Sequence, residues 1–151
     1  MIYGVDKPVI IQLTSTQWTN GERMPSIHLT TEGQLSEQNG TWAIRYDESE
    51  ATGMAGTKTK ISLAPSGAVR LERRGEIEMD IVFREGQNHL SQIAMPYGTL
   101  NFQLTTSEAR GRLNAEGGNV SLAYSLAFDK SQVISTNLSL VVRASEWHMP
   151  G

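Results

Sequence analysis

Cysteine does not occur anywhere in the 151 residues of this sequence. Its absence excludes disulfide bonds, thiolate metal ligands and a nucleophilic thiol, and it suits a reducing compartment. Long apolar runs are missing from the start of the chain, where the longest covers residues 9–11. Such a run is far too short for a signal peptide or a membrane span. We therefore expect a cytoplasmic protein that does not insert into a membrane.

An excess of positive charge is missing as well. Thirteen Lys and Arg stand against sixteen Asp and Glu, which gives a net charge of -3. The basic residues concentrate between positions 45 and 84, but acidic residues of the same segment match them in number. This balance argues against binding to a phosphate backbone, so we expect no nucleic-acid partner.

Helical periodicity is nearly missing too, and apolar and polar residues alternate instead. Residues 27–35 show the pattern, and Trp42, Ile44 and Tyr46 continue it after the hairpin turn that Asn39-Gly40 predicts. Further strands are predicted at about 5–18, 56–63, 68–73, 77–84, 89–95, 99–105, 119–128 and 133–143. Glycine, proline or polar residues with turn-forming chemistry separate these strands.

Strands that are apolar on one side only must stack as a sandwich or close into a barrel. Hairpin links in series favour closure, which also removes exposed edges. The sequence predicts an all-β fold, a closed antiparallel barrel of about 8–10 strands in mostly up-and-down order, formed by residues 1–151 as a single domain. We expect at most one or two helical turns, in the linker at 18–25 where the alternation lapses.

A set of short motifs in a fixed order points to a known family. The motifs are Tyr46-Asp47-Glu48, Gly53-Met54, Gly56-Thr57-Lys58-Thr59, Arg73-Arg74-Gly75, Phe83-Arg84-Glu85-Gly86 and Pro96-Tyr97-Gly98, with weaker matches at Gly117-Gly118, Tyr124 and Asn137. In these residues the chain resembles the YwiB-like family of small bacterial proteins of unknown function. The resemblance implies a calycin-like, lipocalin-type β-barrel and leaves activity open. The chain departs from the pattern at Ile93 and Met95, where we expect tyrosine and threonine.

Two charged residues fall on the apolar side of their strands. Arg73 follows Val69 and Leu71 at alternate positions, and Glu48 follows Ile44 and Tyr46 in the same way. Thr57 and Thr59 share a face with Ile61 and Leu63. A charge facing the inside of a barrel is costly unless it is paired or solvated. Either Arg73 and Glu48 satisfy each other, or Arg73 presents its planar fork to an anionic ligand.

Three functions follow from these alternatives. The first is a binding module that holds a small amphipathic or anionic ligand, with Glu48, Thr57, Thr59, Arg73 and Tyr97 lining the barrel interior or its mouth. The second is a structural or protein-interaction barrel with a self-filled core, and the third is an enzyme of unknown class. The internal volume decides between the first two, because a small barrel either packs solid or holds one ligand.

Other candidate sites have simpler interpretations. The three histidines, at positions 28, 89 and 148, are scattered without ligand spacing, so we expect neither a metal nor a cofactor. No set of residues stands out as catalytic. The aromatic side chains either form a ligand cage or fill the core, and we interpret them as core. The sequence leaves the oligomeric state open.

Overall fold

Eleven β-strands and one turn of 3-10 helix make up the described part of the computed structural model, residues 5–129 and 131–145. The strands are β1 (Val5–Thr19), β2 (Glu22–Arg23), β3 (Ile27–Gln38), β4 (Thr41–Asp47), β5 (Lys58–Leu63), β6 (Val69–Arg74), β7 (Met79–Phe83), β8 (Asn88–Met95), β9 (Gly98–Asn114), β10 (Gly117–Asp129) and β11 (Gln132–Ala144). The helical turn is η1 (Glu50–Thr52).

All these strands belong to one antiparallel sheet. Its order is β7-β6-β5-β4-β3-β1-β11-β10-β9-β8, and β2 pairs with β1 alone. Strands that are neighbours in sequence therefore pair around the sheet, and β1 lies between β3 and β11. The two end strands meet at one bridge, where the backbone amides of Glu78 and Ala94 each donate to the other's carbonyl at 3.0 Å. The result is a nearly closed ten-strand barrel in up-and-down order, as the alternation predicted.

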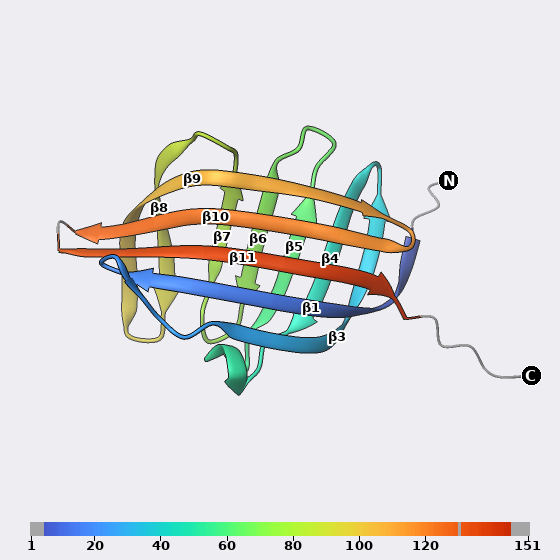
Figure 1. Cartoon of the computed structure of the whole chain (residues 1–151), viewed down its shortest axis with the longest axis horizontal. Coiled ribbons are helices and arrows are strands. Elements are labelled where there is room, and N and C mark those ends of the chain that lie inside the picture. Colours follow the sequence, from blue (N-terminus) through green and yellow to red (C-terminus); the bar gives the residue numbers. More distant parts are fainter. Residues whose placement is uncertain (1–4, 130, 146–151) are drawn as a thin grey trace, which may run out of the picture.

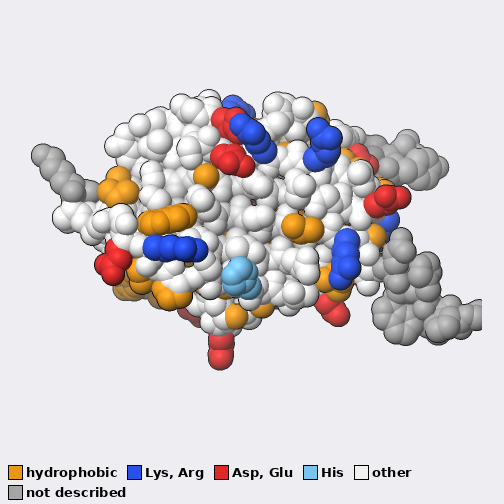
Figure 2. Space-filling model, in the orientation of Figure 1, with side chains coloured by type: hydrophobic (Ala, Val, Ile, Leu, Met, Phe, Trp, Pro, Cys, Tyr) orange, Lys and Arg blue, Asp and Glu red, His pale blue; other side chains and the backbone are white. Residues whose placement is uncertain are grey.

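Long and short strands form two walls that cross at a steep angle. In Figure 1 the long strands β1, β9, β10 and β11 run lengthwise, and the shorter β4 to β7 cross behind them. The space-filling view of the same side shows charged side chains scattered over the outer face rather than gathered into one patch (Figure 2). Among the described residues, no helix is long and apolar enough to cross a membrane.

The predicted hairpin at Asn39-Gly40 is confirmed. Gln38 pairs with Thr41 across the turn, and both turn residues have positive φ, 55° and 84°. Such angles suit the turn that matches the twist of two paired strands.

The predicted position of helical turns was wrong. Residues 18–25 hold the tight hairpin between β1 and β2, in which Trp18 pairs with Arg23 around Asn20-Gly21. The helical turn lies at Glu50–Thr52 instead, where Ser49 caps it. Asn20-Gly21 carries the same turn chemistry as Asn39-Gly40, and the short strand after it hides the hairpin from a search for alternation.

The solid part of the core occupies one half of the barrel. Its fully buried residues include Ile11, Ile44, Leu71, Phe83 and Leu104, each at 0% exposure. The other half, where β1 and β10 end and β11 begins, carries the inward-facing residues that surround a cavity. The fold thus places any interior site at this end.

Candidate functional site

One row of paired residues crosses four neighbouring strands and faces inward. Tyr46 on β4 pairs with Thr59 on β5, Thr59 pairs with Arg73 on β6, and Arg73 pairs with Met79 on β7. Tyr46, Thr59 and Arg73 are buried and Met79 is half-buried. The parity of the strands, which places every second residue on the same face, therefore brings an arginine into the interior.

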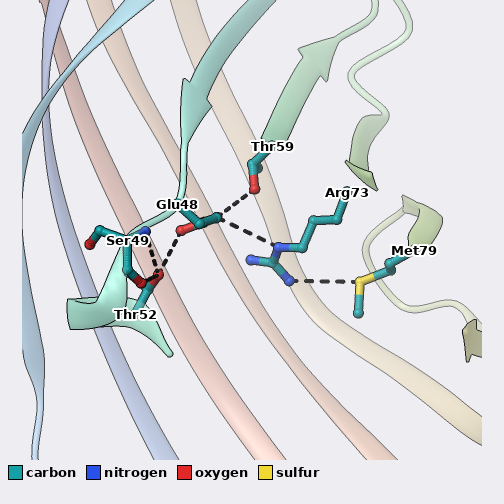
Figure 3. A network of polar contacts seen from close by, with 6 residues as sticks. All are labelled: Glu48, Ser49, Thr52, Thr59, Arg73 and Met79. Atoms are coloured by element: carbon teal, nitrogen blue, oxygen red, sulfur yellow. Dashed lines mark hydrogen bonds and ion pairs between the residues drawn. The ribbon is translucent and has the colours of Figure 1, made fainter. Parts of the chain in front are cut away.

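Glu48 lies opposite Arg73. It continues the inner face of β4 just beyond the strand end, and its side chain is 1% exposed. Oε2 of Glu48 accepts a hydrogen bond from the Thr59 hydroxyl and lies 3.7 Å from Nε of Arg73. Oε1 accepts from the Thr52 hydroxyl at 2.9 Å. Both carboxylate oxygens are thus engaged by protein groups (Figure 3).

The helical turn η1 holds Thr52 in place. The Ser49 side chain accepts from the amide of Ala51 at 3.2 Å, and the amide of Ser49 donates to the Thr52 hydroxyl at 3.4 Å. This reciprocal arrangement is a capping box, which fixes the first turn of a helix. The capped turn after β4 therefore holds the Thr52 hydroxyl within hydrogen-bonding distance of Glu48.

Arg73 has far weaker protein partners than Glu48. Its side chain is 11% exposed, and its Nε has no hydrogen-bond acceptor among the described residues. Nη1 donates to Sδ of Met79 at 3.8 Å, and a thioether is a weak acceptor. A guanidinium carries five N–H donors, so oxygen atoms of the described residues leave most of the hydrogen-bonding capacity of Arg73 unmet.

Arg73 and Glu48 line an interior cavity of about 320 Å³. Ligand pockets commonly span about 300–1,000 Å³, so this volume suits one small molecule. The lining is mainly apolar, and includes Leu13, Ile93, Leu126, Phe128, Ile134 and Leu138. Met54, Met79 and Met95 add three flexible thioether side chains. Ten strands leave room that an eight-strand barrel fills with its own side chains.

Two tyrosines also face this cavity. The rings of Tyr124 and Phe83 lie 4.7 Å apart, and Tyr46 stands next to Glu48 and Arg73. Burial raises the pKa of Tyr46 well above the ordinary value of 10.0, and the charge of Glu48 raises it further. Arg73 opposes that shift by favouring the phenolate, but burial and Glu48 prevail. The Tyr46 hydroxyl is therefore a neutral hydrogen-bonding group at physiological pH.

The unfolding free energy should accordingly fall above pH 10. There the unfolded chain loses the Tyr46 proton while the folded protein keeps it, so the difference in bound protons favours unfolding. We expect the fall to be steeper in wild type than in Tyr46→Phe by up to about 1.4 kcal/mol per pH unit. Urea unfolding of both proteins between pH 8 and 11 measures it. Parallel curves would show that Tyr46 titrates normally in the fold.

The five residues predicted as lining or mouth positions divide into three groups. Glu48 and Arg73 line the cavity and face each other, as their parity indicated. Thr59 is buried behind them and supports Glu48, while the buried Thr57 hydroxyl has no hydrogen-bond partner within the described part of the chain. Tyr97 does not line the cavity. It is 76% exposed, in the turn between Met95 and Leu100, which both do.

A larger hollow of about 710 Å³ lies on the outer surface, between β1 and β3 on one side and β4 to β6 on the other. Its charged side chains neutralise each other in part: Lys58 lies 3.4 Å from Asp47, and Arg74 lies 3.5 Å from Glu72. The side chains of these pairs are exposed or partly exposed, and ion pairs at such positions contribute little to stability. The interior cavity is the better candidate because its charges are buried.

The positions of the described side chains do not support a metal site. Among the described residues, no three His, Asp or Glu gather in a group that could hold a metal ion. His28 is exposed on β3 and contacts the Thr14 hydroxyl at 3.4 Å. His148 lies outside the described residues.

Comparison with known proteins places the chain in a family. The model of the domain of unknown function DUF1934 matches residues 11–140. The chain belongs to this family. A relative of this chain, the uncharacterised β-barrel protein YwiB of Bacillus subtilis (strain 168), is 24% identical over 135 residues, which cover 89% of this chain and 92% of YwiB. The crystal structure of the B. subtilis protein superposes with a TM-score of 0.75 at 20% identity, covering 90% and 92% of the two chains.

The DUF1934 match includes Glu48 and Arg73 together with the residues that contact them, Thr52, Thr59 and Met79 (Figure 3). The family resemblance in the sequence is thereby confirmed, and the barrel fold with it. Ile93 and Met95, where the chain departs from the expected pattern, both line the cavity. The departure makes this part of the cavity wall apolar.

Sequence reasoning missed one member of the site, Thr52, which belongs to the loop after β4, where alternation gives no direction. Tyr46 and Tyr124 were among the aromatic residues that either form a ligand cage or fill the core, and they were interpreted as core. Met79 has the inward parity of Ile77 and Ile81, and methionines suit either an adaptable cavity or an irregular core.

Proposed function

We propose that this protein is a binding module that holds one small amphipathic ligand inside its barrel. The observation that carries the proposal is Arg73, a buried guanidinium on the wall of a 320 Å³ cavity, whose donors find among the described residues only the weak thioether acceptor of Met79. Buried donors without acceptors are costly, and oxygen atoms of a ligand would relieve that cost. Around Arg73 the wall is mainly apolar, which suits the rest of an amphipathic molecule.

The proposal also includes the class of barrel and the location of the protein. Ten antiparallel strands in next-neighbour order around one cavity support a calycin-like barrel. We also propose a cytoplasmic location, which rests on the sequence alone.

Isothermal titration with octane-1-sulfonate, a small anion with a straight apolar chain, provides the test. We expect saturable binding to wild type with one site. Arg73→Met should weaken binding about 10- to 100-fold, because hydrogen bonds to charged groups contribute about 1.5–3 kcal/mol. Arg110→Gln is the matched control, since Arg110 is an exposed outer-face arginine that pairs with Glu85 at 2.6 Å.

A protein-interaction role is the second candidate. Leu90 on β8 is 81% exposed and Tyr97 in the next turn is 76% exposed, which gives the outer surface two large apolar side chains. If octane-1-sulfonate does not bind saturably, and native mass spectrometry of the protein from its own host finds no bound small molecule, the cavity proposal fails. The outer surface then becomes the candidate.

A further inference from the structure

We infer that the ligand is a monocarboxylate with an apolar body, bound with its carboxylate on Arg73 and its apolar end toward the opening of the cavity. The inference rests on the proposed function and adds the chemical class, the size and the orientation of the ligand. Four observations carry it, one on hydrogen-bonding capacity, one on charge, one on volume and one on exposure.

The unmet capacity at the site consists of donors. Glu48 already accepts from Thr52 and Thr59, whereas Arg73 has an ion pair at 3.7 Å and a thioether at 3.8 Å. Glu48 keeps Arg73 in position and faces its Nε side. Within the described part of the chain, the Nη1 side meets only Met79, a weak acceptor that a ligand oxygen would outcompete. The ligand must therefore supply oxygen acceptors, and a planar pair of oxygens fits the planar fork.

The charge of the cavity limits the ligand to one negative charge. Arg73 and Glu48 are the charged residues in the described lining, so their sum is zero. A dianion such as a phosphate monoester would place its second charge near Glu48, where like charges repel. An amine would oppose Arg73. A carboxylate can accept two parallel hydrogen bonds from the guanidinium and carries the opposite charge, whereas a neutral alcohol offers one oxygen and no charge.

The volume sets the size of the apolar body. A water molecule takes about 30 Å³ of liquid volume, so 320 Å³ corresponds to about ten waters and hence to a ligand of about ten non-hydrogen atoms. Octanoate has that size. The apolar lining residues accommodate its chain without any polar partner.

Exposure sets the orientation. The charged side of the cavity is its closed side, since the side chains of Arg73 and Glu48 are 11% and 1% exposed. Gln17 and Leu100, which line the cavity from β1 and β9, are exposed, Leu100 by 37%, and Phe128 on β10 is half-buried. The carboxylate therefore lies on the closed side and the chain end lies at the opening. Extra length at the chain end should be tolerated, and bulk beside the carboxylate should not.

Isothermal titration with one chain and several head groups tests the chemistry. We expect octanoate to bind wild type at least 10-fold more tightly than octanol, octylamine or octyl phosphate. Arg73→Met should remove the preference for octanoate over octanol, and Arg110→Gln, which removes an exposed arginine of the outer face, should keep it. Equal affinity for octanol, or retained preference in Arg73→Met, would overturn the assignment of the carboxylate to Arg73.

Two further carboxylates test the orientation. The isomer 2-propylpentanoate has the atoms of octanoate with its bulk next to the carboxylate, and it should bind at least 10-fold more weakly. Dodecanoate should bind no more weakly than octanoate, because its end passes through the opening. A 10-fold loss with dodecanoate, or equal binding of the two isomers, would overturn the orientation.

Failure of the inference is distinguishable from failure of the proposed function. Saturable binding of octane-1-sulfonate without a preference for octanoate over octanol leaves the binding module standing and rejects the ligand class. Absence of binding by octane-1-sulfonate and by every other octyl compound rejects both.

Discussion

Replacing Glu48 with alanine should destabilise the protein by about 3–5 kcal/mol, the cost of breaking a buried ion pair by removing one partner. The substitution leaves the Arg73 cation without its counter-charge in a site where it is 11% exposed. It also removes the acceptor of the Thr52 and Thr59 hydroxyls. Urea unfolding of wild type and variant measures the difference, which is a large share of the stability of an ordinary domain.

Removing the other partner should cost less. In Arg73→Met the carboxylate of Glu48 keeps two hydroxyl donors, so we expect a loss of about 1–3 kcal/mol. The double mutant should reveal a coupling near the lower end of the usual 0.5–3 kcal/mol for residues in contact, because Nε and Oε2 are 3.7 Å apart without a hydrogen bond. Strong coupling would favour a closed structural pair over a cavity that holds a ligand.

A matched control lies on the outer face of the same sheet. Asp47 and Lys58 pair at 3.4 Å, one residue before Glu48 and one before Thr59, but their side chains are 77% and 81% exposed. Asp47→Ala should change stability by less than about 1 kcal/mol, the usual limit for exposed ion pairs. Equal losses for Asp47→Ala and Glu48→Ala would contradict the interior position of Glu48.

Alternation was sufficient to predict the barrel because most strands have one buried and one solvated face. The same parity placed Arg73 and Glu48 inside, although their charge alone argues for the surface. Parity fails wherever a strand changes face without ending. In β9 the register shifts at Ser107, so the buried side passes from Phe102, Leu104 and Thr106 to Ala109 and Leu113.

That bulge explains the largest error in the predicted strands. The sequence predicts a strand that ends at position 105, and β9 continues to Asn114. Beyond the bulge the inward positions include Ala109 and Gly111, which are too small to mark an apolar face. The cavity could not be predicted from the sequence, because its volume depends on the angle at which the long strands cross the short ones.

Replacing Gly118 with alanine should be among the most damaging single changes in the protein. Gly118 has a φ of +145°, and an added Cβ would lie 1.8 Å from the carbonyl oxygen of Arg112 on β9. We expect a loss of about 2–6 kcal/mol, the sum of about 1–3 for the backbone conformation and about 1–3 for overpacking.

Gly86 offers the comparison that separates clash from backbone strain. It also has a positive φ, +79°, but an added Cβ would meet no atom within 4 Å. Gly86→Ala should therefore cost only the strain, about 1–2 kcal/mol. The thermal unfolding midpoints of the two variants measure the difference. A clearly lower midpoint for Gly118→Ala than for Gly86→Ala supports the close approach of β10 to β9 at Arg112. Equal midpoints would mean that the strands at this turn lie further apart, since strain alone would then account for both losses.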